Sequence, residues 1–239
     1  MAASDSDAPT VLLVDDEPDL VELLQYTLEQ DGYRVLTATN GTAGLALAEA
    51  ERPDVAVLDI MMPEMDGIEL TQRLREDAQL RLTPIILLTA RVEESDEIAG
   101  LDAGADDYVT KPVSPKKLAS RVRAMIRRQA REDEASTAQL RVHDLLIDRE
   151  RYVVERPETE EAFKMPRKEF ELVYYLASHP DRVFTRAELL DAVWGPDVYV
   201  VDRTVDVHVR KVREKLGSHY IETVKGVGYK MVGELEAQA

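Results

Sequence analysis

The chain has 239 residues, enough for one or two domains, and its lack of cysteine excludes disulfides, thiolate metal sites and cysteine nucleophiles. The net charge of −17 lies mainly in the first half, because residues 1–139 hold 14 Lys and Arg against 28 Asp and Glu. Residues 203–230, with seven basic and three acidic residues, are locally basic. No apolar run approaches 18 residues and the N-terminus lacks the pattern of a signal peptide, so we expect a cytoplasmic protein with no membrane span.

Short apolar runs alternate with amphipathic stretches over the first half of the chain. The runs predict buried strands at Thr10–Val14, Arg34–Ala38, Val55–Leu58, Ile85–Thr89 and Tyr108–Val109. The stretches between and after them predict helices over Leu20–Glu29, Thr42–Ala50, Gly67–Arg75, Ser95–Ala103 and Pro115–Arg128. This alternation predicts an α/β domain with a doubly wound, five-stranded parallel sheet that is covered on both faces.

The pattern changes after a polar stretch that ends near residue 138. Short strands are predicted at Leu140–Val142, Leu145–Asp148, Tyr152–Glu155 and Ala162–Lys164, then helices close to residues 167–178, 186–193 and 202–216. Thr185 and Glu188 have the spacing of a capping box at the second of these helices. The chain closes with a hairpin, Tyr220–Val224 and Tyr229–Val232. This order predicts a second, α+β domain of the winged-helix type.

Polar side chains follow four of the predicted parallel strands. Asp15 and Asp16 come after the first strand, Asp59 after the third, Thr89 ends the fourth and Lys111 follows the fifth. The carboxyl ends of parallel strands meet at one edge of a sheet, where ligands bind. Three carboxylates there suit Mg²⁺, one of them can act as a nucleophile, and the lysine can pair with a phosphoryl group. Helix caps and turns are the alternative for each aspartate alone, but they do not explain the whole set.

The first half resembles the receiver domain of two-component response regulators, over residues 10–131. The matching segments are VLLVDDEPD, VAVLDIMMPEMDG, PIILLTA and GADDYVTKP. The resemblance implies a sheet of flavodoxin-like order, a sensor histidine kinase as phosphodonor, no catalysis beyond self-phosphorylation and self-dephosphorylation, and a cis Lys111–Pro112 bond. It implies the following roles: Asp59 as phosphoacceptor, Asp15, Asp16, Asp59 and the Met61 backbone carbonyl as Mg²⁺ ligands, Thr89 and Tyr108 as a switch pair, and Lys111 as the phosphoryl contact. Val113 departs from the family, which usually has an aromatic residue there.

The predicted helix over residues 202–216 has two different sides. Val205, Val209, Val212 and Leu216 form an apolar stripe, and Asp202 is a natural N-cap. The opposite side is expected to carry the polar residues Arg203, Thr204, His208, Arg210, Lys211 and Arg213. A basic face over an apolar seam suits a helix that enters the major groove of DNA, although a solvated amphipathic helix is the alternative when the helix is taken alone.

Residues 140–233 resemble the effector domain of OmpR/PhoB-type regulators. The matching segments are KEFELVYYLASHP, TRAELLDAVWG, DRTVDVHVRKVREKL and IETVKGVGYKM. The resemblance implies that the helix reads double-stranded promoter DNA, that Lys225 in the hairpin approaches the minor groove, and that the loop at 195–201 after a buried Trp194 can face RNA polymerase. We therefore expect an acidic, disordered N-terminus (1–9), a receiver domain (10–131), a linker (132–139), a winged-helix DNA-binding domain (140–235) and a tail (236–239).

The resemblance also implies a homodimer of phosphorylated receivers. The expected ion pairs across its two-fold axis are Asp107 with Arg121, Asp102 with Arg123, and Glu97 with Lys117, the last with its charges reversed from the usual family order.

Two other functions stay open from the residues themselves. A Mg²⁺-dependent aspartyl phosphotransferase with an external substrate normally needs a second acidic residue where this chain has Met61. A winged-helix regulator that binds a protein is opposed by the net charge of +4 over residues 203–230.

Overall fold

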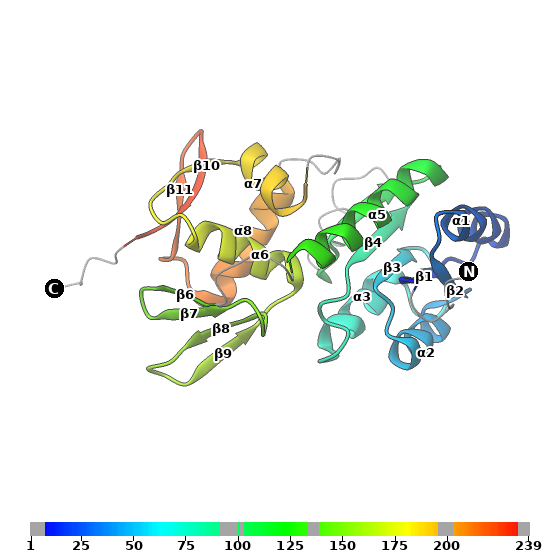
Figure 1. The fold of residues 1–239 in the computed structure, drawn as a ribbon, viewed down its shortest axis with the longest axis horizontal. Helices are drawn as coiled ribbons and strands as arrows, with labels where there is room; N and C mark the ends of the chain where they lie inside the picture. The colour runs from blue at the N-terminus through cyan, green and yellow to red at the C-terminus, as the bar shows by residue number, and fades with distance from the viewer. Residues whose placement is uncertain (1–7, 91–99, 101–102, 133–138, 196–202, 234–239) are drawn as a thin grey trace, which may run out of the picture. The chain divides into compact units, whose positions relative to one another are not determined.

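The computed structural model of the chain divides into two compact units, residues 1–134 and residues 135–239, each with its own helices and strands (Figure 1). The structure describes residues 8–90, 100, 103–132, 139–195 and 203–233. Within the described ranges, no helix combines the length and the apolar character that a membrane span requires.

The first unit is built on a parallel sheet. Its strands are β1 (Thr10–Val14), β2 (Arg34–Ala38), β3 (Val55–Asp59), β4 (Ile85–Thr89) and β5 (Asp107–Thr110). They lie in the order β2-β1-β3-β4-β5, which confirms the predicted five-stranded, doubly wound sheet of flavodoxin-like order. Every residue of β1, β3 and β4 is buried, as expected for central strands with both faces covered.

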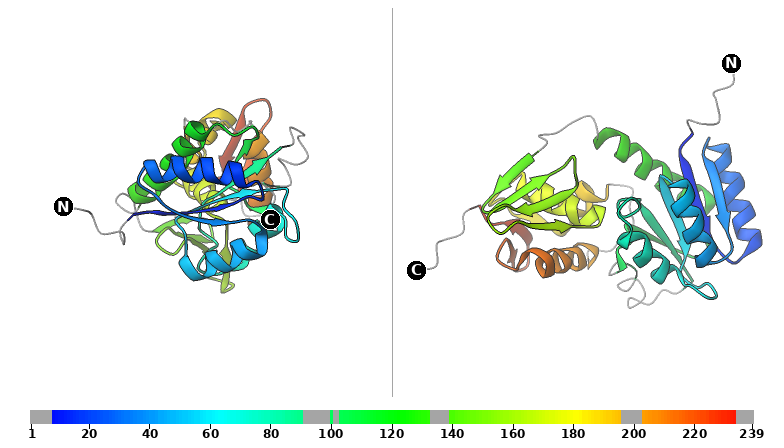
Figure 2. Two further views of the ribbon diagram at one scale, coloured as in Figure 1. Left: turned by 90° about the vertical axis from the view of Figure 1, so that its right-hand side faces the viewer. Right: turned by 90° about the horizontal axis from the view of Figure 1, so that it is seen from below.

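Helices cover both faces of this sheet, as the left view of Figure 2 shows. The described helices are α1 (Pro18–Gln30), α2 (Gly41–Glu51), α3 (Gly67–Glu76) and α5 (Pro115–Glu132). Val11 and Leu13 of β1 point into the core beneath α1 and α5, whereas Leu12 and Val14 point into the core beneath α2 and α3. The helix predicted over Ser95–Ala103 falls mostly outside the described residues.

The second unit begins with an antiparallel sheet. Its strands are β6 (Gln139–Val142), β7 (Leu145–Asp148), β8 (Val153–Arg156) and β9 (Glu161–Lys164), in the order β6-β7-β8-β9. The four strands were expected from the sequence at nearly these positions. Leu145, Ile147 and Val154 are fully buried, so the sheet covers one side of a hydrophobic core.

Three helices and a small second sheet complete this unit. The helices are α6 (Arg167–Ala177), α7 (Arg186–Val193) and α8 (Arg203–Leu216), and the strands are β10 (Phe184–Thr185), β11 (Ile221–Val224) and β12 (Gly228–Met231). Thr185 caps α7, and its side chain and that of Glu188 form the predicted capping box. The hairpin β11–β12 after α8 is the wing, so the predicted winged-helix domain is confirmed.

The wing is attached to the start of α7 by a strand that the sequence pattern does not predict. Residues of β10 pair with β12, in the register Phe184 with Tyr229 and Thr185 with Gly228. A Cβ atom on Gly228 would lie 1.9 Å from the Phe184 backbone oxygen, so this close approach requires glycine. The two strands of the wing therefore belong to a three-stranded sheet, in the order β10-β12-β11.

Candidate functional site

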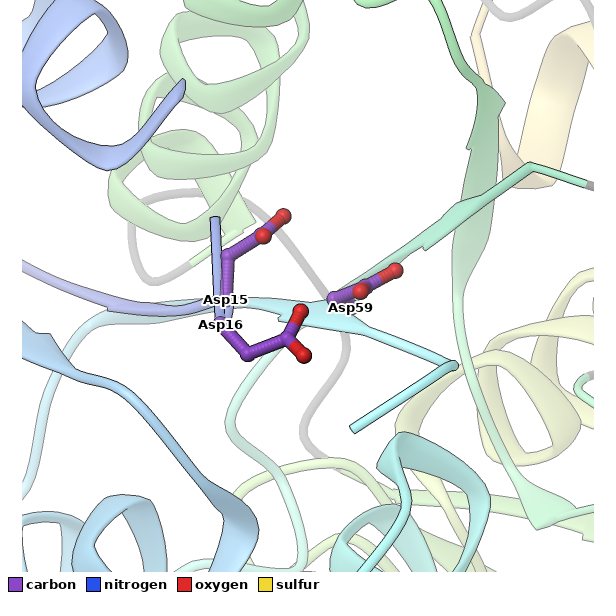
Figure 3. A group of neighbouring side chains, drawn as sticks. All are labelled: Asp15, Asp16 and Asp59. Atoms are coloured by element: carbon purple, nitrogen blue, oxygen red, sulfur yellow. The ribbon is translucent and has the colours of Figure 1, made fainter. Parts of the chain in front are cut away.

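Three aspartates meet at the carboxyl edge of the parallel sheet (Figure 3). Asp15 and Asp16 directly follow β1, and Asp59 ends the neighbouring strand β3. One carboxylate oxygen from each lies within 4.8 Å of the other two. Asp15 and Asp59 are buried, whereas Asp16 is exposed. The sheet topology thus brings together the acidic residues that the sequence placed after two separate strands.

Lys111, which follows β5, reaches the same cluster. Its Nζ lies 2.7 Å from Glu17 Oε1, 2.9 Å from Asp15 Oδ2 and 3.2 Å from Asp59 Oδ2. The peptide bond from Lys111 to Pro112 is cis, as predicted. The contact with Glu17 was not predicted, although Glu17 stands next to the two aspartates in the sequence.

The charges in this cluster shift one another's ionisation. Burial raises the pKa of the Asp59 carboxyl, the negative charge of Asp15 raises it further, and Lys111 opposes both effects. Burial alone would lower the pKa of the Lys111 ammonium, but three neighbouring carboxylates raise it above its ordinary value. The cluster therefore holds more negative charge than its one lysine can balance.

A divalent cation fits this arrangement. Carboxylate oxygens are the ligands that Mg²⁺ and Ca²⁺ prefer, and three of them converge here. Oδ1 of Asp59 is buried and accepts no hydrogen bond from the part of the chain that the structure describes. A buried carboxylate oxygen without a partner is unfavourable unless a ligand satisfies it. The donor set and its excess negative charge both suit a cation.

Of the remaining residues predicted for this site, Thr89 lies at the same edge of the sheet, whereas Tyr108 lies earlier in its strand and pairs with Leu87. Thr89, which is buried, ends β4 one residue beyond Leu88, the strand partner of Asp59. Tyr108 on β5 is half-buried and packs against the core beneath α2 and α3. Met61 is exposed and lies two residues after Asp59.

In the second unit, the apolar stripe of α8 is buried as predicted. Val205, Val209, Val212 and Leu216 are each at most 2% exposed. The expectation that Thr204 and His208 lie on the exposed polar side is wrong, because both are buried. The His208 ring packs edge-on against Trp194, with the ring centroids 4.8 Å apart, and its Nδ1 lies 2.8 Å from the Thr204 backbone oxygen. The predicted burial of Trp194 is confirmed.

The basic residues that were predicted to contact DNA fall into two groups. Arg210 and Lys225 are exposed and Lys211 is half-exposed, so these three can reach a ligand outside the domain. Arg213 was predicted for the same role, but its guanidinium donates to the Ile221 backbone oxygen at 2.7 Å and to Thr223 Oγ1 at 2.8 Å. Arg213 therefore connects α8 to strand β11 of the wing by hydrogen bonds. The side chain of Arg203 lies outside the described residues.

Comparison with known proteins identifies both units. Residues 11–123 match the family model of the response regulator receiver domain, and residues 160–231 match that of the C-terminal domain of transcriptional regulatory proteins. The alkaline phosphatase synthesis transcriptional regulatory protein PhoP of Bacillus subtilis is 44% identical over 234 residues, covering 92% of this chain and 95% of that protein. This chain belongs to the OmpR/PhoB family of response regulators.

Other members of the family agree with this assignment. The phosphate regulon transcriptional regulatory protein PhoB of Rhizobium meliloti is 44% identical over 227 residues, which cover 93% of this chain and 98% of that protein. The solved structure of response regulator DrrB, an OmpR/PhoB homologue of Thermotoga maritima, is 31% identical with a TM-score of 0.50, covering 95% of this chain and 100% of that chain. The regulator is thus a DNA-binding transcription regulator of a two-component system, and phosphorylation and dimerisation follow from the family.

Among the charged residues predicted for a dimer of this regulator, three form ion pairs within the chain: Asp107, Arg121 and Arg123. Asp107 was expected at the surface, but it is buried because it begins β5 beside Ile86 of the buried strand β4. Its carboxylate binds Arg121 of the same chain. Arg123 lies 2.7 Å from Asp31 of its own chain.

The other members of the predicted ion pairs are Lys117, Glu97 and Asp102. Lys117 is exposed on α5, as a dimer contact requires. Its predicted partner Glu97, and Asp102 as predicted partner of Arg123, lie outside the described residues.

Proposed function

We propose that Asp59 accepts the phosphoryl group from a sensor histidine kinase. The phosphorus–nitrogen bond of the phosphohistidine breaks and a bond from phosphorus to an Asp59 oxygen forms, which gives an acyl phosphate. The observation that carries this proposal is the convergence of buried Asp59 with Asp15, Asp16 and Lys111 at one sheet edge. The catalysis is confined to phosphorylation and dephosphorylation of this aspartate, with no external substrate.

The other residues of the cluster have distinct roles in this proposal. Asp15, Asp16, Asp59 and the backbone carbonyl of Met61 would hold Mg²⁺. When bound, this ion supplies positive charge that balances the carboxylates and the phosphoryl oxygens. Lys111, already 3.2 Å from Asp59, pairs with a phosphoryl oxygen as a point charge. The ion pair between Glu17 and the Lys111 ammonium must then weaken.

Thr89 and Tyr108 convert this local charge change into a change of packing. The Thr89 hydroxyl donates a hydrogen bond to the phosphoryl group and moves toward it. The space it leaves lets the Tyr108 ring turn inward, and the surface beside β5 and α5 changes. The half-buried position of Tyr108 supports this role, because a ring at the edge of the core can occupy either an inward or an outward position.

The changed surface is the one through which we propose that two phosphorylated receivers pair. Lys117 of one chain would meet Glu97 of the other, and Arg123 would meet Asp102. A cross-chain pair between Asp107 and Arg121 would require each to exchange a partner that it already has within the chain. The exposed Lys117 therefore makes the sharpest test of this interface.

In the winged-helix domain, α8 enters the major groove and Arg210 and Lys211 contact phosphates or base edges. Lys225 at the wing approaches the adjacent minor groove, as a compact charge without the flat guanidinium of arginine. The loop at 195–201 would face RNA polymerase. The exposure of Arg210 and Lys225 supports the DNA contacts. We also propose that the protein acts in the cytoplasm, where a bacterial regulator of this kind meets DNA.

The proposal is tested by DNA binding at graded salt, with and without phosphorylation by acetyl phosphate and Mg²⁺. A duplex selected by the phosphorylated protein from a random-sequence pool serves as the ligand. Phosphorylation should raise the affinity in the native protein but not in Asp59→Asn, and affinity should fall steeply with salt because phosphate contacts release counterions. Affinity that does not respond to phosphorylation, or a flat salt dependence, would contradict the proposal.

A further inference from the structure

The wing is joined to α8 through the side chain of Tyr229. This residue lies on β12 and is 5% exposed, and its hydroxyl contacts α8. The hydroxyl donates to Oδ1 of Asp206 at 2.7 Å, and Arg186 Nε donates to the same oxygen at 2.7 Å. One carboxylate of α8 thus ties together the wing strand and the first residue of α7.

Two guanidinium groups flank the same aromatic ring. Cζ of Arg186 lies 5.1 Å from the Tyr229 ring centroid, and Cζ of Arg213 lies 5.7 Å from it. Cations within about 6 Å of a ring centroid attract its π-electrons. Arg213 also binds the backbone of Ile221 and the hydroxyl of Thr223 on β11. Both strands of the wing are therefore attached to the helix that carries Arg210 and Lys211.

The far end of the hairpin has no such attachment among its described neighbours. Gly226 adopts a φ of 73°, which suits the tight turn, and Lys225 and Val227 on either side are exposed. The position of the tip is consequently fixed by the root of the hairpin. A small rotation about that root would move the tip much further than the root itself.

We propose that the hydrogen bond from Tyr229 to Asp206 is a positioning contact that sets the place of the wing tip relative to the exposed face of α8. Lys225 and the Arg210–Lys211 pair then meet two adjacent grooves of DNA at the same time. A side chain that is already positioned before binding loses less conformational entropy on binding than one that must first become ordered. This inference rests on the proposed function, because it assumes that Lys225 contacts DNA.

Tyr229→Phe removes the hydrogen bond to Asp206 together with the weaker one, at 3.3 Å, that the hydroxyl accepts from Arg186 Nη2. The phenyl ring keeps its burial and its place between the two arginines, and only the hydroxyl is lost. Asp206 remains paired with Arg186 at 2.7 Å, so the charge of this half-exposed carboxylate keeps a partner. The domain should keep its melting temperature to within a few degrees and its circular dichroism. Tyr174→Phe on α6 makes the same chemical change away from the wing and is the matched control.

The test is a double-mutant cycle with Lys225→Ala, measured as Kd for the selected DNA duplex. We expect Lys225→Ala and Tyr229→Phe each to weaken binding about five- to tenfold, whereas the double variant is no weaker than Lys225→Ala alone, because contacts that act as a unit are not additive. Tyr174→Phe should leave Kd unchanged. No effect of Lys225→Ala would overturn the wing contact and this inference with it. If Lys225→Ala acts but Tyr229→Phe does not, or if the two effects simply add, the positioning role alone is overturned.

A second pair of variants distinguishes the hydrogen bond from the charge. Asp206→Ala should weaken binding as Tyr229→Phe does. Asp206→Asn keeps an oxygen that can accept from the Tyr229 hydroxyl, so it should restore at least half of the lost affinity. Equal losses in both variants would assign the effect to the negative charge of Asp206 and would overturn the proposed role of the hydrogen bond.

Discussion

Glu17 Oε1 lies 2.7 Å from the Nζ of Lys111, although 94 positions separate the two residues. The Glu17 side chain is 62% exposed, whereas that of Lys111 is 12% exposed. The lysine thus shares its one charge between an acidic residue at the rim of the site and the buried carboxylates within it. This arrangement lets Lys111 stabilise the unphosphorylated cluster and still remain within reach of a phosphoryl group on Asp59.

Loss of the Lys111 charge should destabilise the receiver in a way that a cation reverses. Lys111→Met should lower the free energy of unfolding by about 1–3 kcal/mol in EDTA, because buried carboxylates lose a charged hydrogen-bond partner. Millimolar Mg²⁺ should recover much of this loss, since the ion supplies the missing positive charge. Thermal melting in EDTA and in Mg²⁺ measures both effects. Lys117→Met, at an exposed lysine of the same domain, is the control. A loss of equal size with and without Mg²⁺ would contradict the account.

The winged-helix domain should lose stability in acid through Glu171. Burial would raise the pKa of its carboxyl, but Lys168 and Arg167 at 2.6 and 2.7 Å lower it from 4.5 to about 2. A pKa lower in the folded than in the unfolded state stabilises the fold above pH 4.5, and this stability is lost as the pH falls toward 2. The contribution at neutral pH is about 3 kcal/mol.

Glu171→Gln isolates this effect. The variant should be less stable than the native protein at pH 7, and the difference should shrink between pH 4.5 and pH 3. Calorimetric melting of the winged-helix domain across this range measures it, with Glu158→Gln at an exposed position as the control. A difference that stays constant with pH would show that the ion pairs of Glu171 are not the cause.

Arg210→Ala and Lys211→Ala should weaken DNA binding without changing phosphorylation of Asp59, because both residues belong to the second unit. Each lost phosphate contact should reduce the slope of log K against log salt by about one unit. Fluorescence anisotropy at graded salt measures both quantities. Lys164→Ala, at an exposed lysine on β9, should leave them unchanged. Native affinity in both α8 variants would rule out the proposed docking of this helix.

A charge-swap cycle tests the receiver dimer. Glu97→Lys should weaken dimerisation of the phosphorylated protein because it places like charges opposite each other at Lys117. Adding Lys117→Glu should restore the dimer with the opposite charge order. Sedimentation of the phosphorylated proteins gives the dimer dissociation constants. A double variant no better than the single variant would reject this pair, and a native protein that stays monomeric when phosphorylated would reject the dimer.

The convergence of the acidic residues with the lysine could be predicted from the sequence, because each of these groups directly follows a predicted strand. Once the strands are parallel and ordered, their ends must meet, and Asp15, Asp59 and Lys111 come together. The role of Glu17 could not be predicted in the same way. Three acidic residues stand side by side there, and only the three-dimensional path of the chain decides which of them reach the lysine.

The polar side of α8 shows where a periodic pattern is insufficient. A stripe of four apolar residues predicts one buried side, but α6 and α7 both pack on this helix and bury Thr204 and His208 as well. Arg213 donates hydrogen bonds to acceptors on β11, and the helical periodicity of the sequence does not predict these partners. Strand β10, with only Phe184 and Thr185, is too short to show any alternation.

Mass spectrometry of the intact protein and its peptides identifies the residue that is phosphorylated. The protein is treated with acetyl phosphate and Mg²⁺, and the acid-labile adduct is mapped. We expect one phosphoryl group per chain, located on Asp59, and none on Asp59→Asn under the same conditions. Full labelling of Asp59→Asn at another specific residue would contradict it.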